Sequence, residues 1–158
     1  MSAFLIKVLY KKSEENMKSI KELLLDESPK NQKKLEKMLA KDPVSASYLA
    51  AVKAEANGAG AMEFTNLHTL VTNSFLCYQD IGIGGGLTIL PISTIRNLYR
   101  TNIVNGEYDY SDFFLAVETS SAIRYMMRVP RPGNGIDKYN DVIAAVRARM
   151  TVNGGAQA

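Results

Sequence analysis

A chain of 158 residues is long enough for one domain with its own hydrophobic core and too short for two ordinary domains. Its apolar content of 46% excludes a disordered chain, and its net charge of +3 allows an acidic partner without requiring one. The single cysteine, Cys77, excludes an intramolecular disulfide, and with only one histidine, His68, we expect no metal site within one chain.

The first residues, MSAFLIKVLYKK, lack the pattern of a secretory signal peptide, because their lysines follow the apolar run instead of preceding it. Phe4 to Tyr10 fits either a strand or a helix, and the helical segments that follow favour a helix. We expect a chain that is intracellular or contained within an assembled particle. We also expect no transmembrane span, since no apolar run reaches about 20 residues.

The N-terminal third contains several predicted helix caps. Ser13, followed by two glutamates, predicts one helix start. Ser28-Pro29 and Asp42-Pro43 predict two more, because each pairs an N-cap with a proline suited to the first helical position. The third helix would end at Asn57-Gly58. The apolar residues expected to face inward are Met17, Ile20, Leu23, Leu24, Leu35, Met38, Leu39, Val44, Tyr48, Leu49 and Val52.

Residues 57–61, Asn-Gly-Ala-Gly-Ala, are the best candidate for a linker. We therefore divide the chain into three parts. Residues 1–57 form a lysine-rich helical region, either packed on the core or separate as an arm. Residues 58–150 form a helical core, and residues 151–158 form a frayed tail.

Four further helices are predicted in the core. Residues 62–78 and 92–103 carry apolar positions at helical spacing, and Asn105-Gly106 closes the second helix with residues able to adopt positive φ. Residues 111–128 are apolar nearly all round the helical wheel, which indicates a central helix or one covered by a partner subunit. The last helix would bury Tyr139, Val142, Ile143, Val146 and Met150.

The predicted fold class is therefore mainly α: a multi-helix, bundle-like single domain with a glycine-rich apolar loop and room for one short strand.

That loop, CYQDIGIGGGLTILPIS, does not match a nucleotide-binding motif. Leu87 stands where the dinucleotide fingerprint requires its third glycine, the segment before the loop predicts a helix, and no lysine lies near enough to meet a phosphate. Shallow membrane insertion is a weaker alternative, because the apolar run is too short to span. We interpret Gly82, Gly84, Gly85 and Gly86 as a hinge or packing loop that leads into a buried segment over residues 87–92.

His68 is similar in setting to the histidine of histidine phosphotransfer domains, with Leu70 in the expected position. However, Val71 and Thr72 stand where that family has the lysine and glycine that serve the phosphoryl group. The resemblance implies a phosphorelay role only as a distant alternative. The sequence indicates no catalytic set of residues and no cofactor.

The arginines and two tyrosines are the candidate interaction residues. Every arginine lies at or after Arg96, and arginine suits fixed ion pairs with carboxylates or contacts with phosphate. Tyr108 and Tyr110 suit a contact surface because each combines an apolar ring with a polar tip. The interface or anion-binding candidates are Arg96, Arg100, Arg124, Arg128, Arg131, Tyr108 and Tyr110. The two arginine pairs, 96/100 and 124/128, would each share one helix face.

The function expected from these features is that of a non-enzymatic structural protein that forms part of a larger homo- or hetero-oligomer, such as a virus particle or another multisubunit machine. The alternative is a small basic nucleic-acid-binding or regulatory protein that uses the lysine-rich helices or the arginines.

Overall fold

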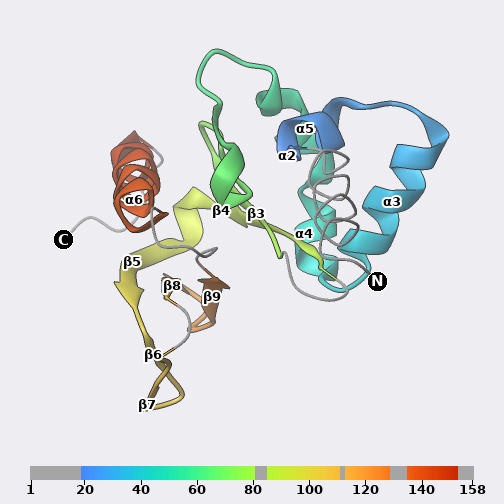
Figure 1. The fold of residues 1–158 in the computed structure, drawn as a ribbon. Coiled ribbons are helices and arrows are strands. Elements are labelled where there is room, and N and C mark those ends of the chain that lie inside the picture. The colour runs from blue at the N-terminus through green and yellow to red at the C-terminus, as the bar shows by residue number, and fades with distance from the viewer. Residues whose placement is uncertain (1–18, 81–84, 111–112, 129–134, 153–158) are drawn as a thin grey trace, which may run out of the picture.

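The computed structural model describes residues 19–80, 85–110, 113–128 and 135–152, and these form three layers (Figure 1). A four-stranded sheet lies in the middle. Helices α2 to α5 cover one of its faces, and helix α6 and a second sheet cover the other. Each face of the central sheet therefore packs against a hydrophobic core of its own.

The helical layer begins two of its helices at predicted caps. Helix α2 (Ile20–Leu25) begins after Ser19, α3 (Pro29–Leu39) after Ser28 and α4 (Pro43–Ser47) after Asp42, and α5 (Leu49–Ala56) ends at Asn57. The starts at Ser28-Pro29 and Asp42-Pro43 and the end at Asn57 are confirmed. However, the single helix predicted between Asp42 and Asn57 is divided into α4 and α5 at Tyr48, and α2 begins after Ser19, which was predicted to lie within a helix. The predicted start at Ser13 and the segment from Phe4 to Tyr10 lie outside the described residues. Val44 was expected to face inward and is instead 60% exposed.

The central sheet, sheet A, replaces the helix predicted over residues 62–78. Its strands β1 (Met62–Phe64), β2 (Thr69–Val71), β3 (Phe75–Gln79) and β4 (Leu87–Pro91) form an antiparallel meander in the order β1-β2-β3-β4, with a short 3₁₀ turn, η1 (Thr65–Leu67), after β1. Side chains alternate along each strand. Phe75 and Cys77 therefore face the helical layer, while Leu76 and Tyr78 face α6 and the second sheet.

Sheet B replaces the two helices predicted over residues 92–103 and 111–128. After the 3₁₀ turn η2 (Ile92–Thr94), strands β5 (Ile95–Thr101), β8 (Phe114–Thr119) and β9 (Arg124–Arg128) pair in the antiparallel order β5-β8-β9. Between β5 and β8 the chain makes a separate hairpin of β6 (Ile103–Val104) and β7 (Glu107–Tyr108). The segment that is apolar on all sides is thus the central strand of a sheet and its neighbour, not a buried helix.

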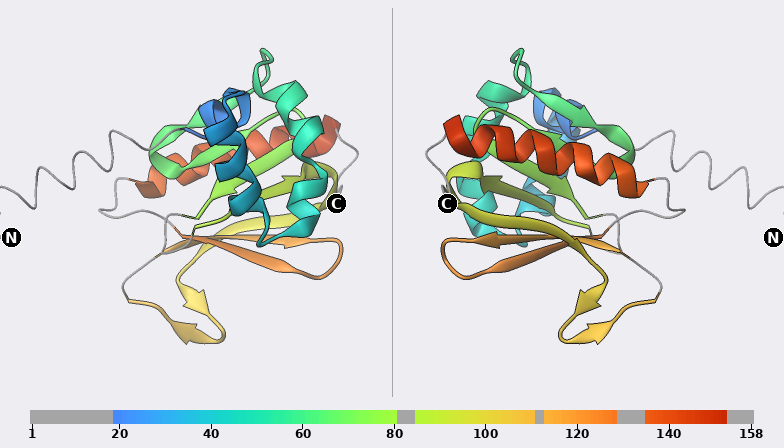
Figure 2. Two further views of the ribbon diagram at one scale, coloured as in Figure 1. Left: turned by 90° about the vertical axis from the view of Figure 1, so that its right-hand side faces the viewer. Right: turned by 90° about the vertical axis from the view of Figure 1, so that its left-hand side faces the viewer.

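Helix α6 (Gly135–Val152) confirms the last predicted helix, and Tyr139, Val142, Ile143, Val146 and Met150 are buried as expected. It lies beside sheet B against sheet A (Figure 2).

The predicted mainly-α bundle is wrong. Within the described residues the chain is a mixed α/β fold with nine strands in three antiparallel sheets.

The candidate linker at residues 57–61 is tied to the body of the protein. The Arg149 guanidinium of α6 donates a hydrogen bond of 2.6 Å to the Gly60 carbonyl. A Cβ atom on Gly60 would collide with the Asn73 side chain, which would have to shift to admit it.

Candidate functional site

The β6–β7 hairpin stands out from the body of the protein (Figure 1). Its two-residue loop is Asn105-Gly106, with φ of 52° and 81°, between the paired residues Val104 and Glu107. Positive φ at both loop residues is the type I′ geometry that suits the twist of a tight hairpin, and Asn-Gly is the pair that adopts it most readily. The expected positive φ is confirmed here, although it closes a hairpin and not a helix.

Two further hydrogen bonds fix the base of the hairpin. The Asp109 N–H donates to the Asn102 carbonyl at 2.6 Å, and the Ile103 N–H donates to the Thr101 hydroxyl at 3.0 Å. We call residues 102–110 the hairpin arm.

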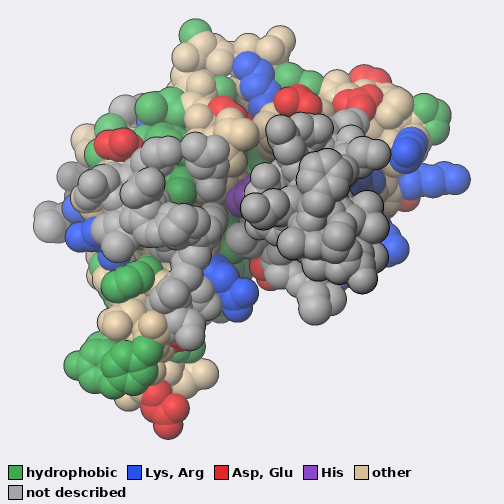
Figure 3. Space-filling view, viewed as in Figure 1, with side chains coloured by type: hydrophobic (Ala, Val, Ile, Leu, Met, Phe, Trp, Pro, Cys, Tyr) green, Lys and Arg blue, Asp and Glu red, His purple; other side chains and the backbone are tan. Residues whose placement is uncertain are grey.

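The hairpin arm exposes aromatic side chains. Tyr108 is 63% exposed and Tyr110 is 88% exposed, and their rings stack with centroids 6.2 Å apart at an angle of 28°. Figure 3 shows hydrophobic side chains gathered at this protruding end of the molecule. Rigid aromatic rings with a polar tip are enriched in protein interfaces, because burying them costs little conformational entropy.

Exposed apolar residues concentrate around the hairpin arm. Of the seven large hydrophobic residues that the described chain exposes, five lie between residues 103 and 123, and the other two are Val44 and Met62. Ile103, Tyr108, Tyr110 and Phe113 lie on the arm or next to its base, whereas Ile123 lies at the other end of β8, where its carbonyl accepts a hydrogen bond from the Thr119 N–H. We call the first four residues the apolar patch.

One edge strand of each of the two larger sheets, in contrast, makes a backbone hydrogen bond with a polar side chain of a helix. The Ser45 hydroxyl of α4 accepts a hydrogen bond of 2.9 Å from the Ile89 N–H on edge strand β4. Arg147 of α6 donates to the Leu98 carbonyl on edge strand β5 at 3.2 Å. Such contacts occupy backbone groups to which another strand would otherwise pair. These two edges are therefore less suited to a neighbouring strand, and the apolar patch is the better candidate for a contact surface.

Edge strand β9 is held by two tyrosine hydroxyls. The Arg128 N–H donates to the Tyr78 hydroxyl at 3.1 Å, and the Tyr139 hydroxyl donates to the Arg128 carbonyl at 3.1 Å. Burial raises the pKa of Tyr78 to about 12, so this phenol stays protonated at neutral pH and serves as a structural link between sheets A and B.

The candidate arginines lie on strands, not helices. Arg96 and Arg100 do not share a face, because a bulge between Ile95 and Asn97 adds one residue to β5. Arg124 and Arg128 do share a face of β9, since positions four apart also coincide at a strand period of two. All four side chains are exposed, and Arg131 lies outside the described residues.

The glycine segment connects β3 to β4. The strand before it removes one objection to a dinucleotide fingerprint, but the element after it is a strand and not the required helix. Gly82 and Gly84 lie outside the described residues. Gly86 packs closely, because a Cβ there would be 3.2 Å from the Met38 carbonyl oxygen, and Gly85 precedes it at the entry to β4. Leu87, Ile89, Leu90 and Ile92 are buried as expected.

The one histidine and the one cysteine are poorly placed for catalysis. His68 adopts a left-handed conformation with φ of 50° at the end of η1, so the helical setting expected of a phosphorelay histidine is wrong. Burial lowers the pKa of His68 and leaves it neutral at pH 7. Cys77 is fully buried, and burial raises the pKa of its thiol, which keeps it unreactive.

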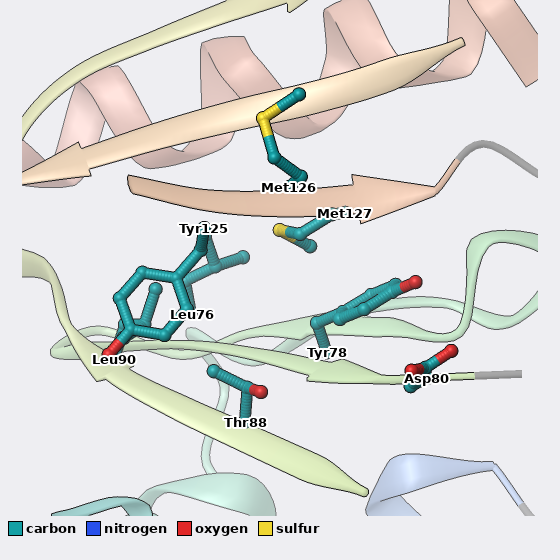
Figure 4. Close-up of a pocket in the computed structure, with 8 residues that line it drawn as sticks. All are labelled: Leu76, Tyr78, Asp80, Thr88, Leu90, Tyr125, Met126 and Met127. Atoms are coloured by element: carbon teal, nitrogen blue, oxygen red, sulfur yellow. The ribbon is translucent and has the colours of Figure 1, made fainter. Parts of the chain in front are cut away.

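A cavity of about 140 Å³ separates β3 and β4 of sheet A from β9 of sheet B (Figure 4). Its walls are mostly apolar, with Asp80 and Thr88 as polar members. This volume is well below the roughly 300 Å³ at which ligand pockets begin, so the cavity fits a packing gap better than a substrate site. Among the residues described, no group of three or more metal-ligating side chains comes together.

No helix in the described part of the chain is both long and apolar enough to cross a membrane. No family model, curated protein or solved structure matches the chain.

The sequence reasoning included Tyr108 and Tyr110 but missed Ile103 and Phe113. Residues 103–108 read Ile-Val-Asn-Gly-Glu-Tyr, and an Asn-Gly pair between strand-forming residues is a strong local signal for a hairpin. That signal would have found the arm.

Proposed function

We propose that this chain is a non-enzymatic structural protein that assembles with neighbouring chains through the apolar patch on and beside the hairpin arm. The observation that carries the proposal is that four of the seven exposed large hydrophobic residues, Ile103, Tyr108, Tyr110 and Phe113, lie on the hairpin arm or next to its base. Contiguous exposed apolar surface on a folded domain marks a site of association. A subunit of a virus particle or of another multisubunit machine would cover such a surface with its neighbours.

The chemistry of the remaining residues supports a structural role over an enzymatic one. The described ionisable groups with shifted pKa values do not converge on one cleft. Glu55 and Glu63 join the helical layer to sheet A, and Tyr78 and Tyr139 join sheet B to its neighbours. Each of these groups makes at least one hydrogen bond that joins two layers.

The test is the native mass of the purified protein by light scattering at about 50 µM, near the concentration at which weak interfaces form. We expect an oligomer, and we expect the variant Tyr108→Ser/Tyr110→Ser to shift it to the monomer. The matched control is Val44→Ser, which removes an equally exposed apolar side chain from the helical layer and should leave the mass unchanged. A native protein that stays monomeric with no partner contradicts the proposal.

A second candidate function, nucleic-acid binding, is favoured by one observation. Lys30, Lys33, Lys34 and Lys37 of α3 are all exposed, while Glu36 is the only acidic residue of that helix. Lysines on one helix face suit sequence-independent contact with phosphates. Binding of a labelled oligonucleotide that weakens as salt rises, and that is lost in Lys33→Gln/Lys37→Gln, would support this function. No binding at low salt would remove it.

A further inference from the structure

The hairpin arm projects beside the outer face of sheet B, the face that sheet B turns away from the core. Tyr125 and Met127 of β9 point toward Leu76 and Tyr78 of sheet A, whereas the side chain of Met126 leaves the strand on the other side (Figure 4). Figure 2 shows sheet B on the side of the body toward which the hairpin arm projects. The arm thus extends past the face that sheet B turns away from the core.

The strand register defines this outer face. Ala116 pairs with Tyr99 on one side and Met126 on the other, and Glu118 pairs with Asn97 and Arg124. Phe114 and Ala116 on the central strand are buried although they belong to neither hydrophobic core, whereas Tyr99 and Met126 on the flanking strands are half-buried. In the part of the chain that the structure describes, no helix packs across this face of β8, whose main contacts are with β5 and β9.

The arm and the outer face carry opposite charge. The arm includes Glu107, which is exposed, and no lysine or arginine occurs from Thr101 to Ile123. The outer face presents the exposed Arg124 and Arg128 at the two ends of β9, with the single carboxylate of Glu118 opposite Arg124 on β8. Arm and face are therefore complementary to each other, and both belong to the same chain.

Because one chain carries both the arm and the face that complements it, two identical chains can pair with two-fold symmetry. The contact between arm and outer face then occurs twice in the dimer. Its composition also fits, because tyrosine, methionine and arginine are enriched at interfaces and lysine is depleted. No lysine occurs between Lys53 and Lys138.

Building on the proposed function, we propose that the partner of the apolar patch is a second copy of this chain. The two copies form a two-fold dimer in which the hairpin arm of each lies across the outer face of sheet B of the other. Tyr108 and Tyr110 then cover Met126 and Tyr99 of the partner, and Glu107 pairs with Arg124 of the partner. Each charge pair occurs twice in the dimer.

The deciding experiment uses two charge-reversed variants, Glu107→Arg and Arg124→Glu. Each alone places like charges opposite each other twice, so we expect the dissociation constant of either homodimer to rise about tenfold or more. Mixed in equal amounts, the two variants form a heterodimer in which both charge pairs are attractive again. We therefore expect the mixture to recover the dimer mass, which an effect confined to one chain would not do.

The control is Glu36→Arg, which makes the same charge change on α3 and should leave the dimer unaffected. Circular dichroism shows that each variant is folded, and a salt titration of the native dimer gives a second measurement, since screening should weaken it. The inference is overturned if the mixture stays monomeric, if either variant dimerises like the native chain, or if the native dimer is indifferent to salt.

These outcomes separate the inference from the proposed function. If Tyr108→Ser/Tyr110→Ser dissociates the native oligomer while Glu107→Arg does not, the reciprocal dimer is wrong and the assembly function stands. If the native chain is a monomer at about 50 µM, which is far above the dissociation constant of a stable interface, both are wrong.

Discussion

The body of this protein and its hairpin arm are held in opposite ways. In the body, two hydrophobic cores lie on the two faces of sheet A, and polar side chains of helices form hydrogen bonds with two edge strands. In the arm, the ladder between β6 and β7 has two residue pairs, and the largest side chains point into solvent. The difference separates side chains that fold the chain from side chains that are left to meet a neighbour. Substitutions can test that separation on one scale, the free energy of unfolding.

The largest loss is expected in the core between sheet A and the layer of α6 and sheet B. Leu76 of β3 is 1% exposed and belongs to that core. Truncation to alanine removes buried methyl groups and leaves a cavity, so Leu76→Ala should lower the unfolding free energy by about 2–5 kcal/mol. The measurement is urea denaturation followed by circular dichroism. The contrasting variant in the arm is Ile103→Ala, for which we expect the unfolding free energy to fall by less than about 0.5 kcal/mol. Equal losses for the two variants would contradict the division between body and arm.

A smaller loss is expected at the edge of sheet A. The buried Ser45 hydroxyl accepts from the Ile89 N–H, and Ser45→Ala would leave that donor without its partner. An unsatisfied buried N–H costs about 1–3 kcal/mol. Ser47 on the same helix is the matched control, because its hydroxyl bonds the Val44 carbonyl at an exposed site and Ser47→Ala should be nearly neutral. If the two alanine variants unfold alike, Ser45 does not protect the edge.

Two glutamates, Glu55 and Glu63, form hydrogen bonds between the helical layer and sheet A, and their substitution tests that junction. Burial raises the pKa of Glu55, but hydrogen bonds from Ser74 and Thr72 outweigh it and hold the pKa below its usual value. The unfolded chain then binds more protons in acid, so the stabilisation is present above about pH 4.5 and is lost as the pH falls through the folded-state pKa. Glu55→Gln should cost about 1 kcal/mol at pH 7 and little at pH 3.

Glu63 is the matched residue, because its pKa is shifted in the opposite direction to that of Glu55. Burial raises its pKa despite the hydrogen bond from the Ile20 N–H, and its second oxygen is buried without a partner. The folded state therefore holds the proton more tightly, and the carboxylate destabilises the fold as the pH rises above about 4.5. Thermal unfolding at several pH values should show Glu63→Gln equal to or more stable than the native chain at pH 7. A loss there as large as that of Glu55→Gln would contradict this assignment.

The sequence predicted the helical layer and α6 because their signals are local. Ser28-Pro29 and Asp42-Pro43 fix helix starts through chemistry within four residues, and α6 has one clear apolar stripe. Sheet A gives no such signal. Both faces of β3 are buried, so Leu76, Cys77 and Tyr78 are apolar in succession and the period-two alternation of a strand is absent.

The candidate site was predicted in part, for a related reason. Tyr108 and Tyr110 are recognisable as contact residues by type, but the exposure of Phe113 beside the buried Phe114 depends on sheet B, which forms only when β5, β8 and β9 meet. The bulge at Arg96 likewise depends on pairing with β8. Contacts distant in the sequence decide these features, and no local pattern carries them.

The smallest change in unfolding free energy is expected for the variant that should alter association most. Tyr108→Ser/Tyr110→Ser removes two rings that stack on each other in solvent and touch neither core. At dilutions where the native chain is monomeric, we expect its unfolding free energy to change by less than about 0.5 kcal/mol. At higher concentration the native chain gains stability from association and the variant does not, because a partner that binds only the folded state shifts the equilibrium by mass action. Urea denaturation at two protein concentrations measures both quantities. A concentration-independent loss of 1–2 kcal/mol, of the size typical of a buried substitution, would instead place the tyrosines among the residues that hold the fold, and the division between body and arm would be wrong.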